Sequence, residues 1–215
     1  MTDHRESIRA ALHARMPTQP HPLLVTHSEV LPAATAWVTL RRWVRSFREA
    51  GLRTGDVVVI RQAPSAQSLV AFLACLWEGL NVHWLCDAAL PQEVRATLPD
   101  SPEDPIAVHD TAPQPWLGAW IGGCSRDDHL DAATLAEALA PREKWRVVEG
   151  RRTWLPTRWC TRAALASSVL PAYAHGAELF LGTGFPFATA DCDFVIGVGD
   201  GSPVPHASFE QAPAP

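Results

Sequence analysis

The sequence predicts an α/β fold with a mainly parallel sheet flanked by helices. Two short apolar runs, 57–61 and 81–86, have the β-branched and aromatic content of buried strands. The helical stretch 65–78 lies between them, and a strand-to-strand spacing of roughly 20–25 residues leaves room for the crossover helix that a parallel pair requires. The chain has 215 residues and 47% hydrophobic content, which suffices for one domain with its own core. We therefore expect a single α/β domain over residues 1–200.

The elements before the first strand follow from periodicity. Residues 3–15 predict a short amphipathic helix and residues 23–26 a strand, on either side of a proline-rich break. Residues 35–50 predict the clearest helix, with Ala36, Leu40, Trp43, Val44 and Phe47 on one face. Its other side carries Arg41, Arg42, Arg45 and Arg48. An anion-binding face is one interpretation of these arginines, and a solvated helix surface is the one that we favour.

Turn and cap signals bound the central elements. Gly51 suits the left-handed position at which a helix ends, and Gly55-Asp56 predicts a tight turn before the first strand. Pro64-Ser65 opens the next helix, and Gly79 ends it before the second strand.

The alternation weakens after residue 86. We expect a short helix at 91–98 and a third strand at 105–109, parallel to the first two. Further strands are expected at 116–122, 179–181 and 194–198, helices at 131–140 and 161–175, and a hairpin formed by 145–152 and 154–159. Thr161 and Gly176 are the expected first and last signals of the later helix. The low-complexity end, residues 201–215, predicts a disordered tail.

One segment resembles a known family. Residues 51–85 read GLRTGDVVVIRQAPSAQSLVAFLACLWEGLNVHWL, a unit of Gly-Asp turn, strand, helix, glycine and strand. This unit is similar to the opening of the AMP-forming acyl- and aryl-CoA synthetases, the adenylate-forming ligases, and the resemblance is strongest over residues 40–91. It implies the fold of the first subdomain of those enzymes. It also implies their chemistry, in which a carboxylate is joined to the α-phosphate of ATP and pyrophosphate leaves.

The resemblance implies a phosphate-binding loop rich in Gly, Ser and Thr that ends in a Pro-Lys pair and precedes a helix. Gly182, Thr183 and Gly184, followed by Phe185 and Pro186, resemble the end of such a loop, but Phe187 stands where lysine is expected. Residues 151–158, RRTWLPTR, precede the helix at 161–175 as the family's loop precedes its helix, but they lack its glycines. Each segment is therefore either a degenerate remnant of the loop, with Gly182, Thr183 and Gly184 as weak nucleotide-binding candidates, or an ordinary turn.

The other parts of the family's machinery do not match. No acidic motif for magnesium and ribose follows residue 187, and Lys144 is the single lysine of the chain. We therefore assign no catalytic residue. The first hypothesis is a truncated, non-catalytic accessory or interaction protein linked to carboxylic-acid activation, such as fatty-acid, polyketide or aryl-acid assembly. The alternative is one half of a split AMP-forming ligase completed by a partner chain, and only this alternative requires ATP and Mg²⁺.

Other site chemistries have weaker support. His109-Asp110 and Cys86-Asp87 follow two expected strands, which makes a Cys/His/Asp nucleophilic site conceivable, although chance placement in loops is favoured. The glycine-rich run 197–201 does not fit a dinucleotide-binding pattern, and a turn is favoured there. The nine histidines and five cysteines show no spacing typical of metal ligands, so no metal site is expected.

Composition and charge restrict the partners. The formal net charge of −5 gives no support to a nucleic-acid surface. Scattered cysteines, the absence of an apolar leader and the absence of a long apolar run predict a cytoplasmic protein with no membrane span. A subdomain of a larger enzyme would expose the surface that once packed on the rest of it. We therefore expect a homodimer or a heterocomplex that uses apolar surface after Pro115, and the Trp-rich segment 145–159, as a half-buried hairpin, is the candidate for covering or forming that surface.

Overall fold

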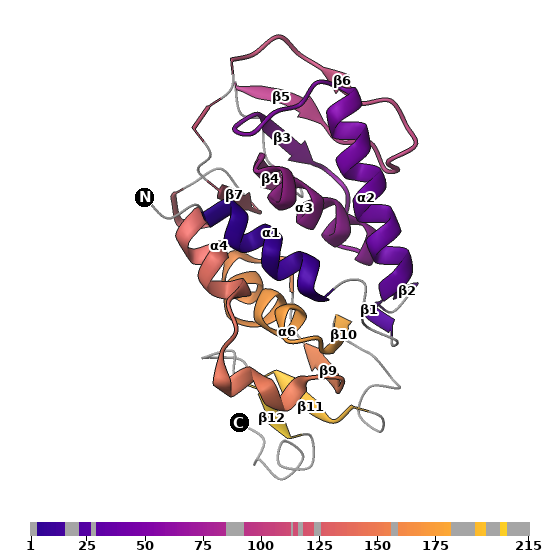
Figure 1. Cartoon of the computed structure of the whole chain (residues 1–215), viewed down its shortest axis with the longest axis vertical. Helices are drawn as coiled ribbons and strands as arrows, with labels where there is room; N and C mark the ends of the chain where they lie inside the picture. Colours follow the sequence, from indigo (N-terminus) through magenta and orange to yellow (C-terminus); the bar gives the residue numbers. More distant parts are fainter. Residues whose placement is uncertain are drawn as a thin grey trace.

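Two mixed, mostly parallel sheets and a group of helices make up the molecule. The computed structural model describes residues 4–15, 22–26, 29–84, 93–112, 114–115, 118–122, 126–155, 159–181, 192–196 and 203–205. Within these residues, one six-stranded sheet has the order β12-β11-β9-β10-β1-β2 and the other β6-β5-β3-β4-β7-β8. Helices lie between the two sheets (Figure 1). The expected α/β class, with a mainly parallel arrangement, is confirmed, but its strands divide into two sheets.

The strands of the first sheet are β1 (Pro22–Thr26), β2 (Glu29–Pro32), β9 (Arg152–Leu155), β10 (Glu178–Leu181), β11 (Phe194–Ile196) and β12 (Pro203–Pro205). Those of the second are β3 (Val57–Ile60), β4 (Asn81–Trp84), β5 (Val94–Thr97), β6 (Ala107–Val108), β7 (Gly118–Ile121) and β8 (His129–Asp131). The helices are α1 (His4–Arg15), α2 (Ala33–Glu49), α3 (Ala66–Glu78), η2 (Arg126–Asp128), α4 (Ala132–Leu139) and η3 (Glu143–Val148). A last helical stretch consists of α5 (Arg162–Ala164), the π-helical η4 (Leu165–Val169) and α6 (Leu170–Ala174).

The unit β3–α3–β4 forms as expected. β3 and β4 are parallel and in register from Val57 and Asn81 onward. Ser65 caps α3 through a reciprocal pair of hydrogen bonds with Ser68, and Gly79 ends the helix in the left-handed conformation at φ 70°. Eleven of the 13 residues of α3 are buried, which explains its nearly continuous apolar sequence.

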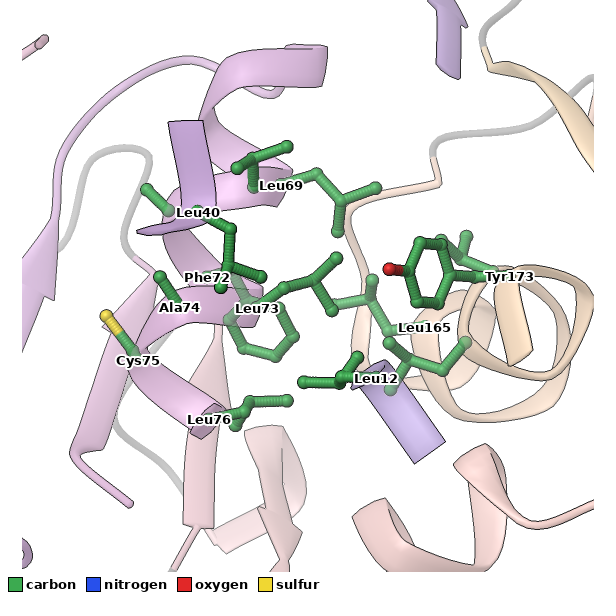
Figure 2. Close-up of a cluster of buried hydrophobic side chains, with 14 of the residues drawn as sticks. Leu12, Leu40, Leu69, Phe72, Leu73, Ala74, Cys75, Leu76, Leu165 and Tyr173 are labelled. Atoms are coloured by element: carbon green, nitrogen blue, oxygen red, sulfur yellow. The ribbon is translucent and has the colours of Figure 1, made fainter. Parts of the chain in front are cut away.

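A single core joins the helices to both sheets. It contains residues of β3 and β4 as well as residues of β10. In Figure 2, Leu12 of α1, Leu73 of α3 and Leu165 of η4 converge from three helices, and the ring of Tyr173 lies against the same cluster. Side chains from both ends of the chain therefore complete the core. None of the helices in the described ranges is long and apolar enough to cross a membrane.

The expectations for residues 91–109 are partly wrong. Residues 94–97 form strand β5, parallel to β3, and not a helix. Val94 and Ala96 are buried while Arg95 and Thr97 are half-buried, an alternation typical of a strand. The strand expected at 105–109 is reduced to the two residues of β6, and it pairs antiparallel with β5. An antiparallel pair such as β5 and β6 can be joined by a loop in which the chain reverses direction, so no crossover helix is needed.

The Trp-rich segment 145–159 does not form the half-buried hairpin that we expected. Residues 143–148 form the 3₁₀ helix η3, and only residues 152–155 form a strand. The side chains of Trp145 and Trp159 are buried in the core. These two tryptophans therefore contribute to the interior, whereas Val147 between them is 51% exposed.

Elements near the two ends also refine the expectations. Thr161 caps the expected helix, which continues to Ala174 and is followed by Gly176 at φ 75°. Within the expected tail, residues 203–205 form β12, which pairs antiparallel with β11. Two further strands, β2 and β8, also had no sequence signal that we recognised.

Candidate functional site

The two segments proposed to hold phosphate include or follow the ends of neighbouring strands. β9 and β10 are parallel neighbours, and their last residues, Leu155 and Leu181, are paired. Residues 152–155 of the candidate segment 151–158 form β9 itself, so only residues 156–158 follow Leu155, whereas Gly182, Thr183 and Gly184 follow Leu181. Because ligands of open α/β sheets bind at the carboxyl ends of strands, this edge is the candidate site. Gly182, Thr183 and Gly184 lie outside the described residues, as do Arg158 and Phe187.

The connection from β9 to the next helix is short and contains no glycine. β9 ends at Leu155 and α5 begins at Arg162, so the residues between them are PTRWC and the cap Thr161. A loop that cradles phosphates directs several backbone N–H groups to one point, and glycine normally permits that conformation. The residues in this connection therefore do not match the loop that the family resemblance implies.

At the start of α5, a side chain of the same protein already binds one of the backbone N–H groups. The hydroxyl of Thr161 accepts a hydrogen bond from the backbone N–H of Ala164 at 3.2 Å. A helix N-terminus binds an anion through backbone N–H groups that have no intrahelical partner. Here one of those donors is used by the cap, which reduces the capacity of this helix end to hold a phosphate.

Two cationic side chains on the helices that flank β9 lie away from this edge. The Nε of Arg162 donates to the carbonyl oxygen of His129 at 2.8 Å, which ties the helix to β8 of the other sheet. Lys144 is exposed on η3, which precedes β9 and so lies toward the amino end of that strand. The single lysine therefore lies away from the edge at which β9 and β10 end.

The conceivable Cys/His/Asp site is contradicted by the sheet topology. β6 is antiparallel to β5, whereas β4, β3 and β5 are parallel. His109 and Asp110 therefore follow β6 at the edge opposite to the one at which the chain leaves β4 toward Cys86 and Asp87. Arg95 holds His109 and Asp110 by hydrogen bonds to the His109 carbonyl at 2.5 Å and the Asp110 carboxylate at 3.4 Å. Cys86 and Asp87 themselves lie outside the described residues.

The structure brings together three rings that sequence reasoning missed. His83 of β4, Trp120 of β7 and His129 of β8 are register partners across three neighbouring strands. The rings of His83 and Trp120 are stacked at 4.5 Å, and those of Trp120 and His129 at 4.3 Å. The sequence does not show which strands pair. Only the alternation of side chains between the two faces of each strand could have suggested that these three rings lie on the same face of the sheet.

Burial sets the protonation state of His83 in this stack. Desolvation lowers the pKa of His83 to about 4, and His129 acts in the same direction, while Glu93 opposes it. His83 is therefore a neutral imidazole near neutral pH. Among the described residues, no group of three or more His, Cys, Asp or Glu side chains is arranged to hold a metal ion. The stack is an aromatic packing element with one strongly perturbed histidine.

A groove beside α2 has a volume of about 820 Å³. Four of its five charged lining residues are paired with one another. Arg42 bonds Glu103 at 2.8 Å, and Arg45 bonds Glu49 at 2.7 Å. The hydroxyl of Ser46 donates to the carbonyl of Pro102. The paired lining leaves little unbalanced charge to orient a ligand.

Comparison with known proteins identifies the fold. No family model and no curated protein matches the sequence. Among solved structures, apo MatB from Rhodopseudomonas palustris matches with a TM-score of 0.62 at 15% identity, over 89% of this chain and 49% of that one. A benzoate CoA ligase from Burkholderia xenovorans LB400 matches with a TM-score of 0.57 at 13% identity, over 86% and 46%.

The N-terminal subdomain of Klebsiella oxytoca NpsA, in complex with 3-hydroxyanthranilyl-AMSN, matches with a TM-score of 0.57 at 15% identity, over 86% of this chain and 55% of that one. The chain thus spans about half the length of the structures that it matches. At these identities the likeness establishes the fold alone. This chain has the α/β fold of the N-terminal subdomain of adenylate-forming ligases.

Proposed function

We propose that this chain is a non-catalytic domain with the fold of adenylate-forming ligases, and that it serves as an accessory, protein-binding module in carboxylic-acid activation. The observation that carries the proposal is the β9–α5 connection. It has no glycine, and the hydroxyl of Thr161 caps the helix that follows it. A protein that transfers the adenylyl group of ATP needs a preorganised set of donors for the phosphates.

The position of the cations supports the same conclusion. Arg162 is bonded to the His129 carbonyl, and Lys144 lies on η3 before β9. Neither side chain is therefore available to stabilise charge on a leaving pyrophosphate at the carboxyl edge of β9 and β10. The class of acid is proposed from the comparisons, since one similar structure is a benzoate CoA ligase and another holds a 3-hydroxyanthranilyl ligand. Fatty-acid, polyketide and aryl-acid assembly are the settings in which such acids are activated.

The direct test is ATP-dependent pyrophosphate release by the purified chain with a panel of aliphatic and aryl acids. We expect the rate to equal the background without protein, while a benzoate CoA ligase assayed with benzoate gives turnover under the same conditions. Robust turnover by this chain would show that the segment around Thr183 or Arg158 is functional. The proposal of a non-catalytic domain would then be abandoned.

A second candidate is one half of a split ligase whose other half is a separate chain. The arrangement of β9 and β10 favours it, because the two strands end at the same edge of the sheet, where a partner could complete a site. ATP and Mg²⁺ would be required only in this case. Co-expression with an adenylating enzyme that lacks its first subdomain is the test. Pyrophosphate release by the complex, but by neither chain alone, would favour this candidate over the first.

Both candidates require a partner or self-association. We propose a homodimer or a heterocomplex in the cytoplasm. Light scattering of the purified protein is expected to report a mass above 23.4 kDa, or a defined partner is expected to co-purify on co-expression. A monomer with no recovered partner would contradict the proposal.

A further inference from the structure

Three arginines from two helices surround one carboxylate on a surface formed by α1, α2 and the end of α3. Glu78 is the last residue of α3, and its side chain is only 13% exposed. Arg48 of α2 approaches it at 2.7 Å, and Arg5 and Arg9 of α1 each approach it at 3.7 Å. One carboxylate therefore lies beneath three guanidinium groups, which leaves the outer surface positive.

An aromatic cluster continues this surface. His13 of α1 contacts Trp37 of α2 edge-on, with ring centroids 5.7 Å apart, and Trp37 contacts Trp77 of α3 in the same way at 5.6 Å. The guanidinium of Arg41 lies over the Trp37 ring at 5.7 Å, and that of Arg9 lies over the Trp77 ring at 5.4 Å. Cations are thus held on aromatic faces on this surface, an arrangement that keeps them ordered while they stay accessible.

The sign of this surface is opposite to that of the chain as a whole. Arg41 has no carboxylate partner within the described residues. The other three arginines of this surface, Arg5, Arg9 and Arg48, pair with Glu78, and Arg9 also pairs with Glu6. The complete chain has a formal net charge of −5. Charges at the surface act over about one Debye length, roughly 8 Å at physiological salt, so this local excess is felt by a bound partner despite the net charge.

We propose that this surface is a docking site for an acidic segment of another protein. It is called the α1–α2 basic face and consists of Arg5, Arg9, His13, Trp37, Arg41 and Arg48. From Arg5 to His13 α1 rises about 12 Å, and from Trp37 to Arg48 α2 rises about 16 Å, at about 1.5 Å per residue. An extended peptide covers that length with about five residues. Aspartate or glutamate side chains on such a segment would pair with the guanidinium groups, which bind carboxylates through two parallel hydrogen bonds.

A nucleic acid fits this surface less well. Proteins that bind single strands offer free aromatic faces on which bases stack. Here Arg41 covers one face of Trp37 and Arg9 one face of Trp77, and the two indoles also contact each other edge-on. A long polyanion would in addition be repelled by the negative remainder of the chain. The surface suits a short acidic peptide better than a phosphate backbone.

Fluorescence anisotropy of a labelled oligoglutamate peptide is the test, with the full chain as the receptor. We expect saturable binding that weakens with added salt and that the Arg41→Glu, Arg48→Gln double variant weakens by about tenfold or more. Arg41→Lys is expected to keep most of the binding, because it keeps the charge. The matched control is Arg146→Glu on η3, an exposed arginine that pairs with Glu143 as Arg45 pairs with Glu49, and we expect it to bind as the unaltered chain does. Thermal unfolding of each variant checks that the fold is retained.

Three results would overturn the proposal. One is the absence of peptide binding by a folded chain. Another is an equal loss of binding in Arg146→Glu, which would indicate a non-specific charge effect. The third is tighter binding of an oligothymidylate of equal charge through the same arginines, which would indicate a nucleic-acid surface. The inference rests on the proposed role as a binding module, but its failure would leave the pyrophosphate-release result unchanged, so the two failures are distinguishable.

Discussion

The Nε of Arg162 donates a hydrogen bond to the carbonyl oxygen of His129 at 2.8 Å and so joins the helix after β9 to the edge strand of the other sheet. The two residues are 33 positions apart in the sequence. The bond connects elements that belong to different sheets, and it draws the first cation of the helix away from the carboxyl end of β9. One contact therefore serves the tertiary structure and weakens the case for a phosphate site.

Replacing this arginine tests the structural role. Arg162→Ala is expected to lower the free energy of unfolding by about 1 kcal/mol, because a hydrogen bond from a charged donor is lost at an exposed position. Urea denaturation measures the change. Arg146→Ala is the control, since its ion pair with Glu143 is local and exposed, and it is expected to change stability by less than about 0.5 kcal/mol. Equal effects of the two variants would contradict the prediction.

Because of His83, we expect the folded protein to lose stability in mild acid. Its pKa is lowered to about 4 in the folded protein, whereas an unfolded histidine titrates near 6.5. Between these values the unfolded chain binds a proton that the folded chain does not, so stability falls as pH decreases through this window. The full loss attributable to His83 is at most about 3.5 kcal/mol, at about 1.4 kcal/mol per pKa unit.

The measurement is urea unfolding at several pH values for the unaltered chain and for His83→Phe. Phenylalanine can still stack on Trp120 but does not titrate, so the variant is expected to lose less stability between neutral pH and pH 4. Parallel pH profiles for the two proteins would show that His83 does not carry the effect.

Gly55 and Gly51 form a matched pair for a backbone test. Both have positive φ, at 89° and 73°, so alanine is strained at either position. A Cβ at Gly55 would lie 1.8 Å from the carbonyl oxygen of Gln114, whereas at Gly51 it would meet no atom within 4 Å. Gly51→Ala is expected to cost about 1–2 kcal/mol and Gly55→Ala clearly more. Similar losses for the two variants, measured by thermal or urea unfolding, would contradict this account.

We expect Cys75 to react slowly with alkylating reagents as long as the protein is folded. It is fully buried in α3, and this burial raises the pKa of its thiol, so the reactive thiolate is scarce. We expect the peptide that contains Cys75 to stay unmodified when the folded protein is treated with iodoacetamide, and to be alkylated in denaturant. Mass spectrometry of the two digests reports the difference. Rapid alkylation without denaturant would mean that α3 opens readily or is not packed as described.

Much of the fold follows from signals that act within a few residues. The strand at 57–60, the Ser65 cap, the apolar helix and Gly79 all appear in one continuous segment, and the parallel pairing of β3 with β4 follows from the length of the crossover. The cap of Thr161 was predictable for the same reason, because a capping hydroxyl needs only the residue three positions later. The resemblance to adenylate-forming ligases depended on these local signals and pointed to the correct fold.

Contacts between distant segments were decided only by the tertiary structure. The sequence contains no information at short range on which strands become neighbours, so the stack of His83, Trp120 and His129 could not be predicted. The direction of β6 and the division into two sheets could not be predicted either, because they depend on the pairing of strands that are far apart in the sequence. The burial of Trp145 is a further case, since a 3₁₀ helix and a strand of alternating polarity are hard to distinguish in a short window. Local periodicity and caps thus determined the elements and their class, while the packing of one element on another decided which side chains meet, because that choice is made by the core that forms between them.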